Sequence, residues 1–76
     1  MTESDGLSQR LITARSIKGL SQQGLAEASG VAAAQVSRYE SGKNAPRPEV
    51  VAKLSRALGV NFDWLLTGNG PEPEGA

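Results

Sequence analysis

Hydrophobic residues recur every three or four positions along most of the chain, a spacing that places side chains on one face of an α-helix. Leu7, Leu11 and Ala14 begin this pattern, and residues 51–58 repeat it further along the chain. Glycine and proline separate the periodic segments, as expected for turns between helices. The pattern predicts an all-α protein, a compact five-helix bundle with helices at residues 6–18, 21–29, 32–41, 48–58 and 62–66.

Residues with known preferences for helix ends stand at several of the predicted limits. Ser21 and Asn61 can accept hydrogen bonds from the free N–H groups at the start of a helix. Pro48 suits a first helical position because its fixed φ angle is already helical. Gly30 and Gly68 suit the residue after a helix, where a left-handed backbone is needed and a Cβ is unfavourable.

Two local features weaken the predicted second and third helices. Gly24 stands three residues after Ser21, where a glutamate would complete a capping box, and a glycine inside a helix costs roughly 0.5–1 kcal/mol relative to alanine. Ala32 stands where a serine or threonine would cap the third helix, a loss of roughly 0.5–2 kcal/mol. Packing against the rest of the chain must therefore hold these helices.

The segment from Leu20 to Asn44 is the most informative part of the sequence. It contains the two short helices at 21–29 and 32–41, joined by a sharp turn. Val36 and Tyr39 lie three residues apart and share the inward face of the second of these helices. The opposite face carries Ala33, Ala34, Ser37, Arg38 and Ser41. This arrangement is a helix-turn-helix, and its exposed helix face can enter the major groove of DNA.

Arg38 is the strongest candidate for reading a DNA base, because it is the only long charged residue on that face. A guanidinium can donate two hydrogen bonds to the O6 and N7 acceptors of guanine. The alternatives are a phosphate contact or a solvated surface arginine. Ser37 can bond a base or a phosphate, whereas Ala33 and Ala34 offer only methyl contact with thymine or helix propensity. The target DNA sequence therefore stays undetermined.

Several short motifs occur in the order found in one family of DNA-binding domains. They are Arg15, Gln22, Leu25-Ala26, Gly30-Val31, Val36-Ser37-Arg38, Glu40, Ser41-Gly42-Lys43-Asn44, Leu58-Gly59-Val60 and Phe62-Asp63-Trp64-Leu65-Leu66. This ordered set resembles the repressor and Cro proteins of lambdoid phages, the Xre-like helix-turn-helix family, over residues 7–68. The resemblance implies a lambda-repressor-like fold that binds double-stranded DNA in the major groove. The family often carries polar base readers at the positions of Ala33 and Ala34, so the sequence departs from the family there.

The resemblance also assigns roles to individual residues. It implies that Arg15 pairs with Glu40, although two unrelated surface charges are the alternative. It implies that Gln22 clamps the DNA backbone, unless this glutamine is merely tolerated at a helix start. Gln23 stands beside it, where free backbone N–H groups and the helix dipole favour a phosphate. A second phosphate contact is expected in the loop, unless the loop is a plain turn; its residues are Ser41, Gly42, Lys43 and Asn44.

Family resemblance further implies a transcriptional repressor of phage or prophage type, in which a homodimer occupies a palindromic operator and blocks RNA polymerase. The residues implied in the dimer contact are Phe62, Trp64, Leu65 and Leu66. An alternative function is that of a DNA-binding antitoxin that also binds a toxin protein. A third class is a helical protein-interaction module that never touches DNA.

The composition limits the available chemistry. With 76 residues, the chain is expected to form one small domain with a modest core. It contains no cysteine and no histidine, which excludes disulfides, thiolate chemistry, most zinc sites and imidazole acid–base catalysis. The acidic residues are scattered and there is no glycine-rich phosphate loop. We therefore expect no enzymatic activity, no metal, no cofactor and no small-molecule substrate.

Charge is unevenly distributed, although the formal net charge is zero. All eight basic residues lie between positions 10 and 56, together with three of the eight acidic residues, so this span carries a charge of +5. The remaining acidic residues lie towards the two ends. A basic body with acidic ends is compatible with DNA binding, although an ordinary solvated surface would also produce it.

The two ends of the chain differ from its body. We expect a flexible N-terminal tail at 1–5, the DNA-binding domain at 6–68, and a disordered tail or the start of a linker at 69–76. No apolar run approaches the roughly 20 residues of a membrane helix and no signal peptide is visible, so a cytoplasmic location is expected. The residues predicted to be buried in the domain are Leu11, Leu25, Ala26, Val31, Val36, Tyr39, Leu54, Leu58, Phe62 and Leu65.

Overall fold

The structure is a computed structural model and describes residues 6–73. Its five α-helices are α1 (Gly6–Lys18), α2 (Gln22–Ser29), α3 (Ala33–Glu40), α4 (Pro48–Leu58) and α5 (Phe62–Thr67). No strand occurs within the described range. The predicted all-α fold is therefore confirmed, and the predicted helix limits differ from the observed ones by at most one residue.

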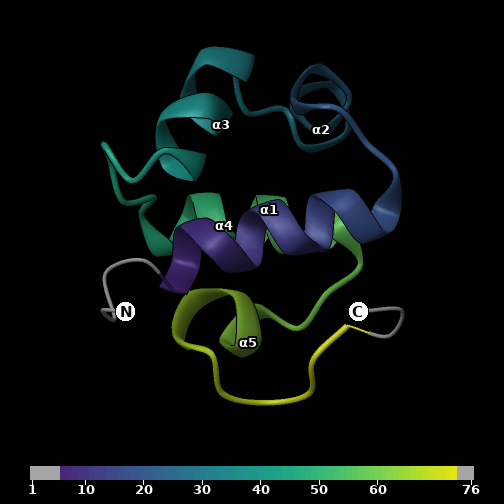
Figure 1. Cartoon of the computed structure of the whole chain (residues 1–76), viewed down its shortest axis with the longest axis vertical. Helices are drawn as coiled ribbons and strands as arrows, with labels where there is room; N and C mark the ends of the chain where they lie inside the picture. The colour runs from purple at the N-terminus through teal and green to yellow at the C-terminus, as the bar shows by residue number, and fades with distance from the viewer. Residues whose placement is uncertain (1–5, 74–76) are drawn as a thin grey trace.

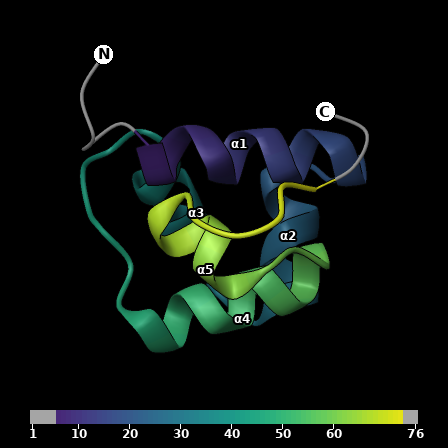
Figure 2. The same cartoon turned by 90° about the horizontal axis from the view of Figure 1, so that it is seen from below.

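Helices α1 and α4 form the middle of the molecule, with the other helices on two sides (Figure 1). On one side α2 and α3 pack against each other, and α2 contacts α4 while α3 contacts α1. On the other side α5 contacts both α1 and α4, between which it lies in the view of Figure 2. The outer surfaces of α2 and α3 are therefore left clear of α5.

The core gathers hydrophobic side chains from every helix. These residues are Leu11, Ala14, Leu25, Ala26, Val36, Tyr39, Val51, Leu54, Leu58, Trp64 and Leu65. Two residues predicted to be buried are absent from this set. Val31 packs against the core but remains partly accessible. The prediction for Phe62 is wrong, because 36% of this residue is exposed.

The geometry of α5 explains why Phe62 lies outside the core. Trp64 and Leu65 are both buried, so the direction of the core lies between these two side chains. Since successive helical residues are about 100° apart, Phe62 points about 110° away from that direction. The buried side of this short helix is therefore set by Trp64 and Leu65.

Side-chain caps begin two of the helices, as the sequence predicts. Ser21 Oγ accepts a hydrogen bond from the Gly24 N–H at 2.9 Å, and Asn61 Oδ1 accepts one from the Trp64 N–H at 3.0 Å. Ala32, at the start of α3, makes no side-chain capping hydrogen bond. Helix α3 therefore lacks the local stabilisation that a side-chain cap gives to α2 and α5.

Helix α5 has six residues, too few for an isolated helix to be stable in water. Arg10 of α1 reaches its last turn and supports it there. Arg10 Nε donates to the Leu65 carbonyl oxygen at 3.1 Å, and Nη2 donates to the Leu66 carbonyl oxygen at 3.2 Å. Burial lowers the pKa of Arg10, but an arginine still remains charged at neutral pH. A cation at the C-terminal end of a helix is also favoured by the helix dipole.

Arg10→Ala should therefore loosen α5. Loss of a charged donor to two carbonyl oxygens should lower the free energy of unfolding by about 1–3 kcal/mol, as measured by urea denaturation. Lys53→Ala is the matched control, because Lys53 is an exposed cation of α4 whose replacement should change stability by less than about 0.5 kcal/mol. Equal and small losses in both variants would contradict this role of Arg10.

Residues 69–73 follow α5 as irregular chain. Pro73 is partly buried and, with Ile17 of α1, lines a hollow of about 160 Å³. The predicted N-terminal tail at 1–5 lies outside the described residues. Residues 74–76 of the predicted C-terminal tail also lie outside them.

Candidate nucleic-acid interface

The turn between α2 and α3 depends on Gly30. This residue has a left-handed backbone with φ of +79°, and its N–H donates to the Ala26 carbonyl oxygen at 2.9 Å. An L side chain would be strained at this φ even though the space around it is free. Val31 follows with its N–H bonded to Ser29 Oγ at 3.1 Å, while its side chain packs against the core. The chain thus reverses over a short loop and packs α3 against α2.

Helix α3 has a buried side and an exposed side. Val36, Tyr39 and Glu40 are buried. The exposed residues on the helix and its cap are Ala34, Gln35, Ser37, Arg38 and Ser41, and Ala33 is partly covered. The face predicted to read bases is therefore accessible along most of the helix. Which of its side chains contact a base stays a prediction.

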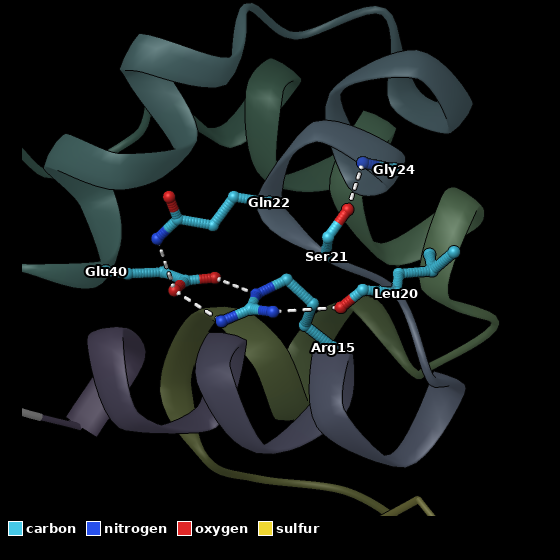
Figure 3. Close-up of polar contacts among 6 residues, drawn as sticks. All are labelled: Arg15, Leu20, Ser21, Gln22, Gly24 and Glu40. Atoms are coloured by element: carbon cyan, nitrogen blue, oxygen red, sulfur yellow. Dashed lines mark hydrogen bonds and ion pairs between the residues drawn. The ribbon is translucent and has the colours of Figure 1, made fainter.

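A network of hydrogen bonds joins α1, α2 and α3 at Glu40 (Figure 3). Arg15 Nε donates to Glu40 Oε2 at 2.6 Å, and Arg15 Nη2 donates to Glu40 Oε1 at 3.0 Å. The remaining nitrogen, Arg15 Nη1, donates to the Leu20 carbonyl oxygen at 2.8 Å. From α2, Gln22 Nε2 donates to Glu40 Oε1 at 3.0 Å. One carboxylate of α3 therefore binds two other helices at once.

This network is largely shielded from water, since the side chains of Arg15 and Glu40 are 19% and 5% exposed. The hydrogen bonds that Arg15 donates to Glu40 raise the pKa of Arg15 above its usual value, against the opposing effect of burial. Within residues 6–73, every buried side-chain nitrogen and oxygen has a hydrogen-bond partner. The bidentate geometry of the Arg15 contact also restricts orientation, so the network fixes how α3 sits against α1.

Replacing one partner of the Arg15–Glu40 pair should strongly destabilise the fold. Arg15→Ala or Glu40→Ala leaves the other charge uncompensated in the interior and should lower the free energy of unfolding by about 3–5 kcal/mol. The double replacement should lose much less than the sum of the two single losses, as urea denaturation of all four proteins would measure. Single losses below about 1 kcal/mol would mean that the pair behaves as a weak exposed ion pair.

The two glutamines predicted to contact phosphate have different surroundings. Gln22 is partly buried and directs one amide hydrogen to Glu40, which leaves its second amide hydrogen for an outside acceptor. Gln23 is exposed, and its Nε2 donates to Glu27 Oε2 of the same helix at 3.4 Å. Gln22 is therefore held in place by the network, whereas Gln23 has only a long contact on the helix surface.

The loop after α3 is organised by a left-handed residue, Gly42, with φ of +80°. Its N–H donates to the Tyr39 carbonyl oxygen at 3.2 Å, and the Lys43 N–H donates to the Arg38 carbonyl oxygen at 3.0 Å. This pair of bonds is a Schellman motif, which satisfies carbonyl groups that a helix end leaves free. The Lys43 side chain is exposed. Asn44 turns back towards α3, where its Oδ1 accepts a hydrogen bond from Arg38 Nε at 2.7 Å.

The structure therefore brings together most of the residues predicted to contact DNA. Arg38 bonds Asn44 through its side chain, and its carbonyl oxygen accepts a bond from Ser41 Oγ at 3.0 Å. Gln22 joins the same end of α3 through Glu40. Hydrogen bonds thus connect the start of α2, the end of α3 and the following loop.

Sequence reasoning missed two polar residues beside those predicted to contact DNA, Gln35 and Arg47. Both are exposed and, with Asn44, line a hollow of about 380 Å³ between α3 and the loop. A glutamine can bond adenine through two hydrogen bonds, and an arginine can bind a phosphate. The helical period could have marked Gln35 as exposed, because it lies about 100° from the buried Val36. Arg47 could have been noticed as a cation just before Pro48 at the start of α4.

The residues predicted to form a dimer contact lie on α5, away from α3. Trp64 and Leu65 are buried in the core of the chain itself, so their side chains are not exposed to a partner. Phe62 is 36% exposed and Leu66 is partly exposed. A contact through α5 would therefore rest on Phe62 and Leu66.

Neither a metal site nor a membrane span is found among residues 6–73. No group of three or more histidine, cysteine, aspartate or glutamate residues in this range could hold a metal ion. No helix of this range is both long enough and apolar enough to cross a membrane.

Comparison with known proteins agrees with this geometry. The family HTH_3, described as helix-turn-helix, matches residues 11–65, a range that reaches from α1 into α5. The chain therefore belongs to this helix-turn-helix family. The resemblance to Xre-like proteins that rests on the order of the motifs is thereby confirmed.

Several relatives carry the names of transcriptional regulators. The SPbeta prophage-derived uncharacterized HTH-type transcriptional regulator YonR of Bacillus subtilis is 42% identical over 60 residues, which cover 79% of this chain and 56% of that protein. The HTH-type transcriptional regulator PrtR of Pseudomonas aeruginosa is 38% identical over 66 residues, 87% of this chain and 25% of that protein. The HTH-type transcriptional regulator for conjugative element R391 of Providencia rettgeri is 39% identical over 64 residues, with coverages of 84% and 29%. The chain thus spans little more than half of the first relative and less than a third of the other two.

A solved structure shares the fold. The crystal structure of an HTH_3 family transcriptional regulator from Vibrio cholerae matches with a TM-score of 0.79, covering 88% of this chain and 38% of that chain. The sequence identity is 22%, so this likeness shows the fold alone.

Proposed function

We propose that this chain binds double-stranded DNA sequence-specifically, with α3 in the major groove, and thereby regulates transcription. The observation that carries the proposal is the exposed side of α3, which presents Ser37 and Arg38 while Glu40 is bonded to α1 and α2. An α-helix fits the major groove. A helix whose buried side is fixed by bonds to other helices can present hydrogen-bond donors at fixed positions on its exposed side. The names of the relatives, HTH-type transcriptional regulators, support the same function.

The contacts divide into those that read sequence and those that hold the backbone. In this proposal Arg38 is the main base reader. The other residues of the reading face are Ser37, Ala33 and Ala34. The second amide hydrogen of Gln22 and the exposed ammonium group of Lys43 bind phosphates next to α3. Phosphate contacts are also assigned to Gln23, Ser41 and Gly42.

We further propose a homodimer on a palindromic operator, acting as a repressor of phage or prophage type in the cytoplasm. One recognition helix reads too few base pairs to find one genomic site among many competitors, and a two-fold dimer doubles the contact. A dimer seated on a promoter excludes RNA polymerase without any catalytic step. Because α5 lies on the opposite side of α1 and α4 from α3 (Figure 1), a partner at Phe62 and Leu66 leaves α3 free.

Selection of bound duplexes from random DNA tests both proposals. We expect enrichment of one palindromic sequence whose half-sites lie about one helical turn apart. The same protein should bind an isolated half-site far more weakly than the palindrome, because only the palindrome engages two copies. Absence of any enriched sequence would contradict sequence-specific binding. Tight binding of a monomer to an isolated half-site would contradict the dimer alone.

Single substitutions should separate base readout from phosphate contact. Arg38→Ala should cost about 1–3 kcal/mol on the selected operator and relax the preference at one base position. Lys43→Ala should weaken binding to operator and scrambled duplex alike, and should lower the salt slope by about one unit. Gln22→Ala should also weaken both, but with little change in slope, because its side chain is uncharged.

Binding isotherms on both duplexes at several salt concentrations distinguish these three variants. Lys53→Ala on α4 is again the control, since this exposed cation lies outside the proposed surface. Equal losses of affinity for operator and scrambled duplex in Arg38→Ala would make Arg38 a phosphate contact instead of a base reader.

A further inference from the structure

We propose that Asn44 is a positioning residue for base readout, because its side-chain amide holds the guanidinium of Arg38 in the orientation that meets the base. This role differs from the phosphate contact that the sequence suggests for Asn44. It rests on the proposed function, and in particular on a base contact by Arg38.

The positioning contact joins two exposed side chains of different elements. Arg38 Nε, on α3, donates to Asn44 Oδ1, in the following loop, at 2.7 Å. A long arginine side chain on a helix surface otherwise samples many rotamers and loses this freedom when it binds. A guanidinium that is already held has less conformational entropy left to lose, and preorganisation of this kind strengthens binding.

The backbone of the loop brings Asn44 to this position. Gly42, with its left-handed φ of +80°, turns the chain back towards the end of α3. The Arg38 carbonyl oxygen then accepts hydrogen bonds from the Lys43 N–H and from Ser41 Oγ, each at 3.0 Å. The loop is therefore tied to the backbone of Arg38 and, through Asn44, to its side chain. The contact belongs to an ordered turn, not to a chance meeting of two free side chains.

The chemistry of the two groups fixes how each one points. A guanidinium carries only donors, so Asn44 must present its oxygen to Arg38 and its NH₂ group away from it. Nε is the innermost nitrogen of the guanidinium. A bond at Nε leaves Nη1 and Nη2, which together can face the O6 and N7 acceptors of guanine. The amide therefore restrains the guanidinium without occupying the pair of nitrogens that would read the base.

Binding of Asn44→Ala to four duplexes tests the proposal. The duplexes are the selected operator and the three that carry another base pair at the position sensed by Arg38. Discrimination at that position should fall about three-fold or more, which is a part of the roughly 5- to 150-fold discrimination that a bidentate base contact provides. In an Arg38→Ala background, Asn44→Ala should cause no further loss of discrimination, because no guanidinium remains to be held.

Asn44→Asp separates the two roles that the amide can play. A carboxylate keeps an acceptor for Arg38 but lacks the NH₂ donor that a phosphate contact requires. This variant should retain the preference at the position read by Arg38. Its added negative charge should lower the affinity for all four duplexes alike. Loss of the preference in Asn44→Asp would contradict the positioning role.

Two further results would overturn the positioning role of Asn44. The first leaves the proposed DNA-binding function intact, whereas the second also removes base readout by Arg38. If Asn44→Ala weakens all four duplexes equally and its loss adds in full to that of Arg38→Ala, Asn44 contacts DNA on its own. The proposed DNA-binding function then survives. If Arg38→Ala itself leaves the discrimination unchanged, base readout by Arg38 fails together with its positioning.

A pair of glycine variants controls for stability. Gly42 and Gly59 both follow a helix with a left-handed backbone, at φ of +80° and +69°. Either glycine changed to alanine should lower the midpoint of thermal denaturation, because an L side chain is strained there. Only Gly42→Ala should also reduce the base discrimination, since it displaces Asn44. Unchanged discrimination in a folded Gly42→Ala variant would contradict the proposal.

Discussion

The buried carboxylate of Glu40 is the constraint on which the arrangement of α1, α2 and α3 depends. Helices α2 and α3 have eight residues each, which is too short for stability in isolation. Glu40 requires donors in the interior, and Arg15 and Gln22 supply them from two other helices. An ion left unpaired at this depth would be strongly unfavourable, so the three helices must assemble together. The pair thus restricts geometry as well as contributing to stability.

The same constraint connects the fold to the proposed DNA contact. Arg38 precedes Glu40 by two residues, so the two side chains leave opposite sides of one helix end. Fixing the buried carboxylate therefore fixes the side of α3 from which Arg38 projects. The use of Glu40 inside the protein also bears on the charge distribution. Arg15 and Glu40 neutralise each other inside the protein, so the excess positive charge between positions 10 and 56 comes from the other basic residues.

The helices could be predicted from the sequence because independent signals agreed on their limits. The hydrophobic period, the caps at Ser21 and Asn61 and the proline at Pro48 all point to the same segments. The exposure of Phe62 could not be predicted, because α5 has fewer than two turns and its apolar residues fit more than one inward direction. In a long helix, the repeated apolar positions determine which face is buried. In a short helix, packing against the neighbouring helices determines it.

Residues of the candidate interface could be found from the sequence, but their partners could not. The helical period places Ser37 and Arg38 on an exposed side, and the structure agrees. The bond from Gln22 to Glu40 depends on how α2 packs against α3, which no local pattern specifies. The bond from Arg38 to Asn44 depends on the left-handed turn between them. The type of a side chain shows whether it can donate or accept a hydrogen bond, whereas the tertiary structure determines which group is its partner.

Titration of the isotope-labelled protein with its selected operator, followed by nuclear magnetic resonance, tests most directly that the exposed side of α3 meets DNA. We expect the largest changes in amide shifts at the start of α2, along α3 and in the loop at 41–44. The Nε–H resonance of Arg38 should move with them. Changes centred elsewhere, with the amides of α3 and the Arg38 side chain unaffected, would contradict the account.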